Sequence, residues 1–174
     1  MRTINIYKFE ELSQDSKNKA IQILQEGLEK RDYSWGSEAL ASIEALCEYF
    51  NVKIKNYSID YSGCNPSFID LEEIEEEATE QQILNLGTFN KDTLKGDGDC
   101  VLTGFCSDED VIDGLRVAYF KEGVKDINEL LQAGFNTWLD ACIKDYEYQL
   151  SEEYAEEEIL SNDYEFFENG TFFN

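Results

Sequence analysis

Carboxylates are the chemical group that this sequence supplies in quantity, because the chain has 38 Asp and Glu and no His. Without His there is no Ser–His or Cys–His nucleophile and no His-containing metal site. Any catalysis would have to use carboxylates, Cys, Tyr or Lys. Among 38 acids a close pair arises by chance, so a glycosidase-like pair stays open but nothing singles one out. We expect a protein that is not an enzyme and uses no cofactor.

The sequence Lys-Gly-Asp-Gly-Asp-Cys at residues 95–100 is the short motif that most resembles a ligand-binding loop. Its glycines would suit a phosphate-binding nest, but Asp97 and Asp99 repel phosphate, and the Gly-Lys-Ser/Thr ending of a P-loop is missing. A calcium loop starting at Asp97 would have Val101 and Leu102 where an oxygen ligand and Gly belong. The pattern favours a tight turn into a strand. We assign no metal site, and Asp97 and Asp99 are the weak candidates for one.

The cysteines are odd in number and show no Cys-x-x-Cys spacing: Cys47, Cys64, Cys100, Cys106 and Cys142. The N-terminus has no apolar signal segment, and no run approaches the roughly 18 apolar residues of a membrane helix. These features indicate reduced thiols, so we expect a soluble cytoplasmic protein that does not bind membranes. Cys100 and Cys106 would share one face of a regular strand. A redox role for them is the alternative.

The net charge of −24 is far larger than the magnitude of about 2–8 that keeps a small domain soluble. Such an excess destabilises a compact chain by self-repulsion and therefore needs a reason. Nucleic acids and anionic membranes attract Lys and Arg, so we expect no direct binding to either.

The acids concentrate in two runs without a basic residue, one between Lys55 and Lys91 and one after Lys144. If both runs form helices, five Glu pairs lie four residues apart, and each pair costs about 0.2–0.5 kcal/mol. Mixed charges would give solubility without this repulsion, whereas a partner rich in Lys and Arg would turn it into attraction. The expected partner-binding residues are Glu72, Glu73, Glu76, Glu77, Glu80, Glu152, Glu153, Glu156 and Glu157. Solubility alone is the other interpretation.

Hydrophobic spacing predicts an α+β fold, with several helices packed on a small antiparallel β-sheet in one acidic domain over residues 1–174. The expected strands are residues 3–7, 52–61 (with a bulge or with two apolar faces) and 100–105. The expected helices are one N-capped by Ser13, one over 37–50, an acidic one over 70–86, one capped by Ser107, a long one over 126–150 and a short one over 151–160. A closing hairpin over 163–173 would turn at Asn169-Gly170 with type I′ geometry.

Three segments together resemble a group of small acidic phage and prophage proteins. These segments are residues 4–22, 96–105 and 145–173, which contain Tyr-Lys-Phe-Glu-Glu-Leu-Ser at 7–13, Gly-Asp-Gly-Asp at 96–99 and Asn-Asp-Tyr-Glu-Phe at 162–166. The group's middle segment often reads Ser-Gln-Gly-Asp-Gly-Ala, whereas here Leu94-Lys95 precedes the glycines and Asp99 replaces the small residue. The resemblance implies a mobile-element origin and suggests an inhibitor of host defence, of the anti-CRISPR kind.

Charge and resemblance lead to one expectation: a basic nucleic-acid-binding protein of the host is the partner, in the bacterial cytoplasm. A type II RNA-guided CRISPR nuclease fits best, because its PAM-reading arginines and basic heteroduplex channel would accept a DNA-mimicking surface. Alternatives are an inhibitor of another DNA-binding host protein, such as a restriction enzyme or toxin partner, and a small divalent-cation protein.

Overall fold

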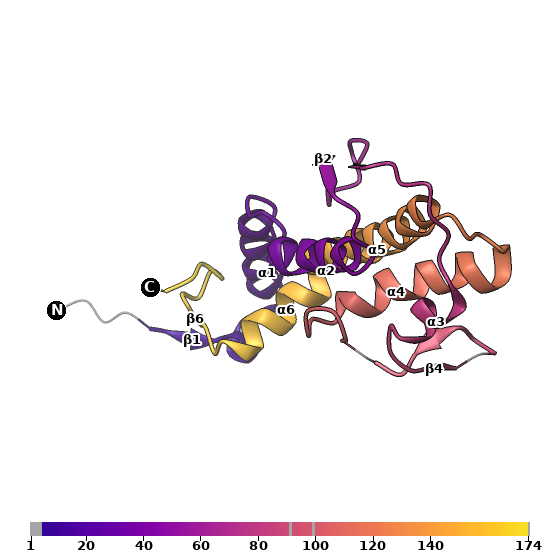
Figure 1. The fold of residues 1–174 in the computed structure, drawn as a ribbon. Coiled ribbons are helices and arrows are strands. Elements are labelled where there is room, and N and C mark those ends of the chain that lie inside the picture. The colour runs from indigo at the N-terminus through magenta and orange to yellow at the C-terminus, as the bar shows by residue number, and fades with distance from the viewer. Residues whose placement is uncertain (1–4, 91, 99, 174) are drawn as a thin grey trace. The chain divides into compact units, whose positions relative to one another are not determined.

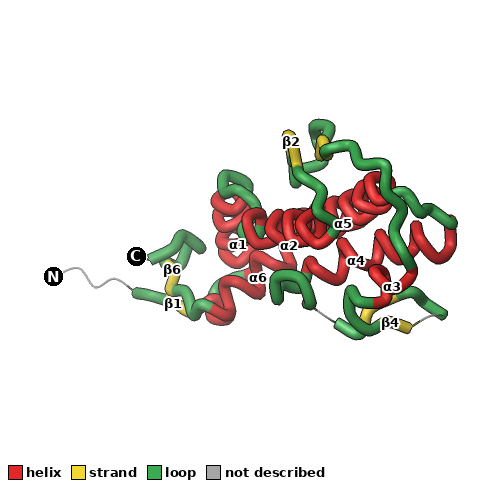
Figure 2. Tube along the Cα trace, in the orientation of Figure 1, coloured by secondary structure: helices red, strands yellow, loops and turns green. Residues whose placement is uncertain are grey.

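A computed structural model of the chain describes residues 5–90, 92–98 and 100–173. It contains helices and short antiparallel strands, which confirms the predicted α+β class (Figures 1 and 2). By contacts the chain divides into a central unit, residues 35–144, and a terminal unit, residues 1–34 with 145–174. A single domain over 1–174 stays a prediction, and each unit is described by itself. Within the described ranges, every helix is too short or too polar to span a membrane.

Three helices form the main body of the central unit: α2 (Gly36–Tyr49), α4 (Ser107–Val117) and the part of α5 (Ile127–Gln149) before Asp145. The predictions for residues 37–50 and 126–150 are therefore confirmed. Close packing explains a glycine in α5: a Cβ on Gly134 would lie 2.8 Å from the Val111 carbonyl oxygen of α4. The core between the helices is made of large apolar side chains, each at most 2% exposed: Ile43, Leu46, Val111, Ile112, Leu115, Leu130, Phe135 and Trp138.

The strands of the central unit form two separate hairpins, not one sheet. β2 (Ile54–Ser58) pairs antiparallel with β3 (Phe68–Leu71), and its register shifts between Ile54 and Asn56, as the predicted bulge requires. β4 (Phe89–Asn90) pairs with β5 (Lys95–Gly96). The short helix α3 (Glu80–Leu84) precedes β4, and a π-helical turn, η2 (Ala118–Glu122), continues α4.

The acidic helix predicted over residues 70–86 is wrong. Residues 70–71 belong to β3, residues 72–79 are not helical (Figure 2), and only Glu80–Leu84 form a helix, α3. Backbone partners from another segment explain the difference: the Ala78 N–H donates to the Lys125 carbonyl (2.8 Å), and the Ile127 N–H donates to the Glu76 carbonyl (3.2 Å). The Ala78 N–H and the Glu76 carbonyl, which would form hydrogen bonds within a helix, are thus bonded to residues 125–127 instead.

The strand predicted over residues 100–105 is also wrong, because a buried carboxylate folds this stretch into a loop. Asp108 is 0% exposed. Its Oδ2 accepts from the backbone N–H groups of Leu102, Thr103 and Gly104 at 2.7–3.1 Å. Three donors that point at one oxygen cannot alternate sides as they do in a strand. The predicted helix after the loop is present, but the predicted cap is wrong: Ser107 is the first residue of α4 and Cys106 is its N-cap. The Ser107 hydroxyl instead pairs with that of Ser42 (2.9 Å).

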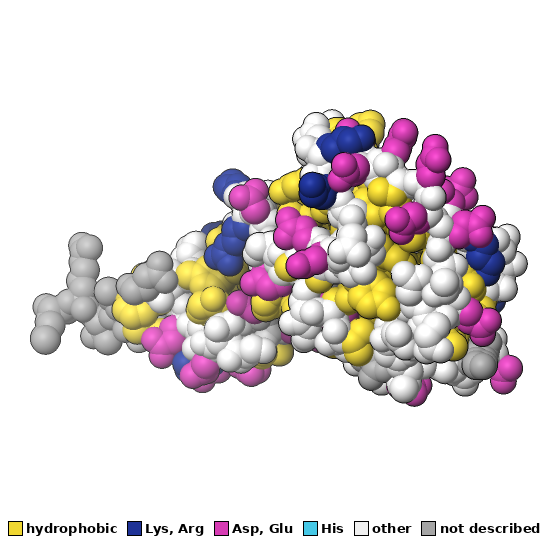
Figure 3. Space-filling view, in the orientation of Figure 1, with side chains coloured by type: hydrophobic (Ala, Val, Ile, Leu, Met, Phe, Trp, Pro, Cys, Tyr) yellow, Lys and Arg dark blue, Asp and Glu magenta, His cyan; other side chains and the backbone are white. Residues whose placement is uncertain are grey.

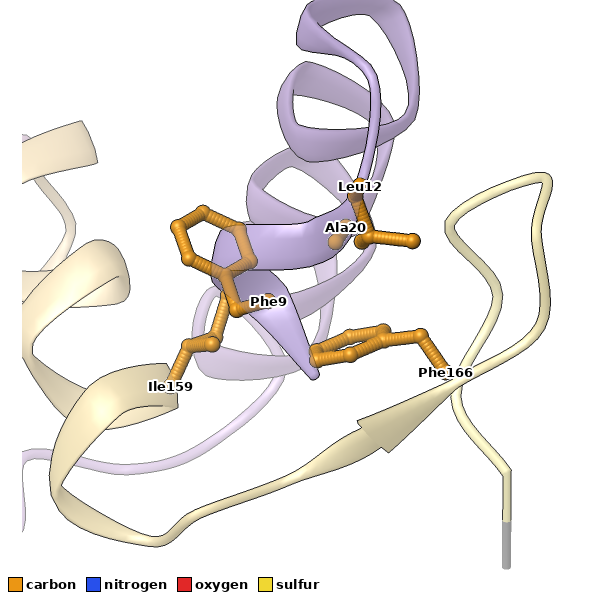
Figure 4. Close-up of a cluster of buried hydrophobic side chains, with 5 residues drawn as sticks. All are labelled: Phe9, Leu12, Ala20, Ile159 and Phe166. Carbon is orange, nitrogen blue, oxygen red and sulfur yellow. The ribbon is translucent and has the colours of Figure 1, made fainter. Parts of the chain in front are cut away.

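The terminal unit packs α1 (Gln14–Leu28) and α6 (Glu152–Ser161) around a small core shown in Figure 4. Its strands are β1 (Tyr7–Lys8) and β6 (Glu165–Phe166), which pair antiparallel, and a 3₁₀ turn, η1 (Phe9–Glu11), follows β1. The predicted N-cap at Ser13 is confirmed, since its side chain accepts from Ser16 N–H at 3.3 Å. The short helix predicted over 151–160 is also present, and Ser151 is its N-cap, accepting from Tyr154 N–H at 3.1 Å. The core residues are Phe9, Leu12, Ala20, Ile159 and Phe166.

The predicted closing hairpin is present, since Phe166 bridges to Phe172 and the Phe167 N–H donates to the Thr171 carbonyl at 2.9 Å. The predicted type I′ turn at Asn169-Gly170 is wrong. The Gly170 N–H donates to the Phe167 carbonyl (2.9 Å), which puts Glu168 and Asn169 at the centre of the turn, and of Asn169 and Gly170 only Gly170 has positive φ. A type I′ turn would need positive φ at both central residues.

Candidate partner-binding surfaces

The acidic segment, residues 72–80 of the central unit, carries five of the nine predicted binding residues. Its backbone is tied down by residues 125–128. Besides the two backbone bonds above, Asn128 donates to the Glu72 carbonyl (2.9 Å) and accepts from the Ile74 N–H (3.2 Å). Ala78, 5% exposed, points into the protein. The segment is therefore held by its backbone and by inward apolar side chains, and none of its carboxylates joins the ion pairs found in the described part of the chain.

All the glutamates of the acidic segment are exposed: Glu72, Glu73, Glu75, Glu76, Glu77 and Glu80. Across the described residues, the ion pairs use Asp113, Asp163 and Glu165, and none of these six glutamates. The prediction did not include Glu75, because it assumed a helix on which Glu75 lies off the selected face. In the non-helical segment it is as accessible as its neighbours.

The charge density of the acidic segment is close to that of one DNA strand. Five of the six residues at 72–77 are Glu. A chain spans at most about 3.3–3.6 Å per residue, so these charges lie within about 20 Å, or roughly one per 4 Å. Along a DNA strand there is one phosphate per about 3.4 Å of axis. The predicted repulsion between Glu residues four apart on a helix does not arise in this segment, because residues 72–79 are not helical.

The helix α6 in the terminal unit carries the other four predicted residues, Glu152, Glu153, Glu156 and Glu157, all exposed. Its opposite face is buried through Ala155 and Ile159. The pairs Glu152/Glu156 and Glu153/Glu157 therefore lie four apart on a helix, as predicted, and repel one another.

Two tyrosines lie beside the α6 glutamates. The Tyr148 hydroxyl donates to Glu157 Oε2 at 2.8 Å, and the Tyr148 and Tyr154 rings meet edge to face with centroids 5.6 Å apart. The bond to Glu157 raises the pKa of the Tyr148 hydroxyl above its ordinary value. Tyr148 is 40% exposed, so it offers an aromatic surface next to the charges. Two further aromatic residues follow α6, but Phe166 is core and Tyr164 packs on Phe172.

The weak cation candidates are not supported by a ligand set. Asp97 Oδ2 accepts from the Thr88 hydroxyl at 3.4 Å, and Gly98 has φ +80°, as a turn requires. Asp99 lies outside the described residues. In the part of the chain that the structure describes, no three Cys, Asp or Glu side chains are grouped as a metal site would need. The predicted tight turn leads into the loop at 100–105, not into a strand.

The cysteines do not share the strand face that was predicted for Cys100 and Cys106, because residues 100–105 form the loop held by Asp108. Cys47, Cys64 and Cys106 are free thiols. Cys47 and Cys142 are buried in the core, and burial raises the pKa of the Cys47 thiol to about 12. A thiol with that pKa stays protonated and acts as a small apolar side chain.

Asp110 is a titratable group that sequence reasoning missed. It lies half-buried in α4 at a cavity of about 420 Å³, which Lys95 and Lys121 also line. Burial, with Glu109 and Asp113 nearby, raises the pKa of the Asp110 carboxyl to about 6, against the opposing effect of Lys144 and Lys95. The only sequence signal was its place in the acidic first turn of a predicted helix, which gives no information on burial.

Comparison with known protein families, with curated proteins and with solved structures finds no match. The exposed carboxylates, their spacing and the contacts that hold their backbone are therefore the features that indicate a function.

Proposed function

We propose that the protein binds a basic nucleic-acid-binding protein of the host and occupies the surface that would otherwise bind nucleic acid. The observation that carries this is the acidic segment: exposed glutamates at nearly the charge spacing of a DNA strand, without ion pairs among the described residues, on a backbone fixed by residues 125–128. Prearranged charges bind with less loss of conformational entropy than mobile ones do. Acidic side chains also spread over much of the face in Figure 3.

Structural anchoring of the segment favours binding over simple solubility. A charged surface that served solubility alone would need no fixed backbone, and it would gain from intermixed Lys. The four α6 glutamates and Tyr148 form a second acidic surface, in the other unit, with an aromatic side chain of the kind that protein interfaces use.

The proposed target is a host defence nuclease, and a type II RNA-guided CRISPR nuclease is the first candidate, in the bacterial cytoplasm. The resemblance to small acidic phage proteins supports this choice of target. The basic channel and PAM-reading arginines of such enzymes are the natural competitors for a DNA-like surface. Since occupying the DNA-binding surface breaks and forms no covalent bond, the protein needs no catalytic residue and no cofactor for it.

The test is competition for DNA in a panel of type II CRISPR nucleases and restriction enzymes, measured at several salt concentrations. At stoichiometric protein we expect one class of enzyme to lose DNA binding, with an effect that weakens steeply as salt rises. A restriction enzyme that responds, with no CRISPR nuclease responding, would reassign the target. If no enzyme loses DNA binding even at low salt, the proposed function is wrong.

Two variants with equal net charge locate the binding surface. In the first, Glu72, Glu73, Glu76, Glu77 and Glu80 become Gln; in the second, five exposed glutamates outside both runs become Gln: Glu10, Glu26, Glu29, Glu38 and Glu48. We expect the first to weaken inhibition at least tenfold and the second to change it little, because close charges dominate screened interactions. Equal losses would show that only net charge matters.

A further inference from the structure

A cavity of about 380 Å³ adjoins the end of the acidic segment. It is lined by Glu80, Phe89, Leu94, Phe120 and Lys121. Glu80 is the last residue of the acidic segment and the first of α3, which lies near β4 in Figure 1. The acidic segment thus leads directly to the opening of an aromatic cavity, although its own sequence contains no aromatic residue.

The walls of the cavity are two phenylalanines fixed from behind. The rings of Phe89 (β4) and Phe120 (η2) lie with centroids 5.6 Å apart, and the Arg116 guanidinium lies 4.4 Å from the Phe89 centroid. Arg116 is 1% exposed and donates to the Leu86 carbonyl at 2.7 Å. These contacts hold the rings in place without closing the cavity.

Leu94 contributes the third apolar wall in a backbone conformation that costs free energy. Its φ is +57°, in the left-handed region that residues other than Gly rarely adopt, and its side chain is 5% exposed. The Leu94 N–H donates to the Asn90 carbonyl at 2.6 Å, which holds the conformation. Such strain is often found where a protein positions a side chain for a binding site.

Two exposed charges of opposite sign stand at the opening, Glu80 and Lys121, and the ion pairs of the described residues do not join them. A Lys beside an aromatic cavity favours an aromatic guest, because an ammonium is attracted to a ring face. The neighbouring Lys125 makes this contact within the protein itself, with Nζ 3.1 Å from the Tyr119 centroid. Glu80, with the glutamates before it, favours basic residues beside that guest.

We propose that the cavity receives an aromatic side chain from a basic segment of the partner, whose Lys and Arg bind the acidic segment. The inference rests on the proposed function for the basic character of that partner, and adds an anchor residue to it. The two parts differ in their response to salt: carboxylates supply a salt-sensitive attraction, and the cavity supplies an apolar contact that salt hardly weakens. Affinity and its salt dependence therefore report on different residues.

Two synthetic peptides test the anchor, Lys-Arg-Lys-Trp-Lys-Arg-Lys and the same peptide with Ala in place of Trp, titrated into the full chain by calorimetry at low and high salt. We expect the Trp peptide to bind about tenfold more tightly at either salt concentration. Phe120→Ala should remove the preference for the Trp peptide, and Lys121→Met should reduce it about threefold. The control is Phe68→Ala, which changes an exposed aromatic residue outside the cavity and should leave the preference unchanged.

Equal affinity for the two peptides, or an unchanged preference in Lys121→Met, would overturn the anchor. If the Phe120→Ala variant does not fold, the comparison of the two peptides on the native chain and on Lys121→Met still tests the anchor. The proposed function is judged separately by the nuclease panel and by the five-residue Gln variant. If peptide affinity did not depend on the charges of the acidic segment but the preference for the Trp peptide remained, the cavity would bind aromatic groups without the acidic segment. That result also contradicts the proposal.

Discussion

At the scale of single residues, two aspartates only two positions apart at the start of α4, Asp108 and Asp110, have different environments. Asp108 is fully buried, and although burial alone raises its pKa, hydrogen bonds from Ser42, Thr103 and Gly104 lower the pKa below the ordinary value. Asp110 receives no comparable set of donors, so burial dominates and the pKa rises to about 6. The backbone N–H groups of residues 102–104 decide which carboxylate is stabilised in its charged form.

We predict that Asp110→Asn flattens the pH dependence of stability between pH 4 and 7. The folded pKa of about 6 lies above the unfolded value near 4, so the folded state binds the extra proton, and native stability falls as pH rises through this window. Since the side chain is partly exposed, the variant should gain about 1 kcal/mol over the native chain from pH 4 to pH 7. Urea unfolding of both proteins at the two pH values measures this.

Asp92→Asn, at an exposed aspartate, is the control for removing one carboxylate. A curve for Asp110→Asn that runs parallel to that of the native chain would contradict the prediction.

At the scale of elements, the closing hairpin meets α1 through a glycine. A Cβ on Gly170 would overlap with the Ser16 carbonyl oxygen, and φ there is +79°. The Ser16 hydroxyl also donates to the Glu168 carbonyl at 2.7 Å, so the turn is fixed against the first turn of α1. Only a residue without a side chain fits this approach.

We predict that Gly170→Ala destabilises the protein by about 2–4 kcal/mol, because it adds both a steric overlap and backbone strain. Gly27→Ala is the matched control in α1, where a Cβ would meet nothing within 4 Å, and it should stabilise the protein by about 0.5–1 kcal/mol. Thermal unfolding of the two variants beside the native chain measures both. A Gly170→Ala variant as stable as the native chain would contradict the packing of the turn on α1.

The elements that were predicted correctly are those whose signals are local. The apolar stripe of α5 and the Ser13 and Ser151 caps lie within a few residues of what they determine. Leu71, Ile74 and Ala78 also have helical spacing, but Leu71 pairs with Ile54 in the β2–β3 hairpin. The backbone N–H groups of Ile74 and Ala78 donate to Asn128 and Lys125, some fifty positions away. The loop at 100–105 depends on the buried Asp108 carboxylate, and a strand pattern does not reveal where a later Asp will lie.

The sequence predicted which residue types the candidate site contains, but it did not predict the shape of the site. All nine selected glutamates are exposed, which charge runs normally are. The aromatic cavity beside them was not predictable, because Phe89, Leu94 and Phe120 come from three segments and are brought together by Arg116 and by the left-handed Leu94.

At the scale of the whole molecule, the net charge of −24 must act against folding as well as toward a partner. We predict that raising NaCl from 10 mM to 500 mM stabilises the protein by about 1 kcal/mol, or about 3 °C in Tm, because the Debye length falls from about 30 Å to below 8 Å. The five-residue Gln variant of the acidic segment should show a higher Tm at low salt and a smaller salt effect. Calorimetry in a neutral buffer measures both.

A Tm that does not respond to salt, or falls with it, would show that the excess charge does not strain the fold. A basic partner should mimic the salt, so adding the Lys/Arg peptides should raise Tm at low ionic strength.

The way in which the acidic segment is attached has a consequence for how the protein can change over generations. Main-chain atoms and a few inward apolar side chains attach the segment to residues 125–128. The exposed side chains at positions 72, 73, 75, 76 and 77 form none of these attaching hydrogen bonds. Those five positions can therefore be rewritten almost freely without loss of the fold. The exposed side chains of the segment can vary while its backbone stays the same. A library randomised at these positions is therefore a direct route to variants with new targets.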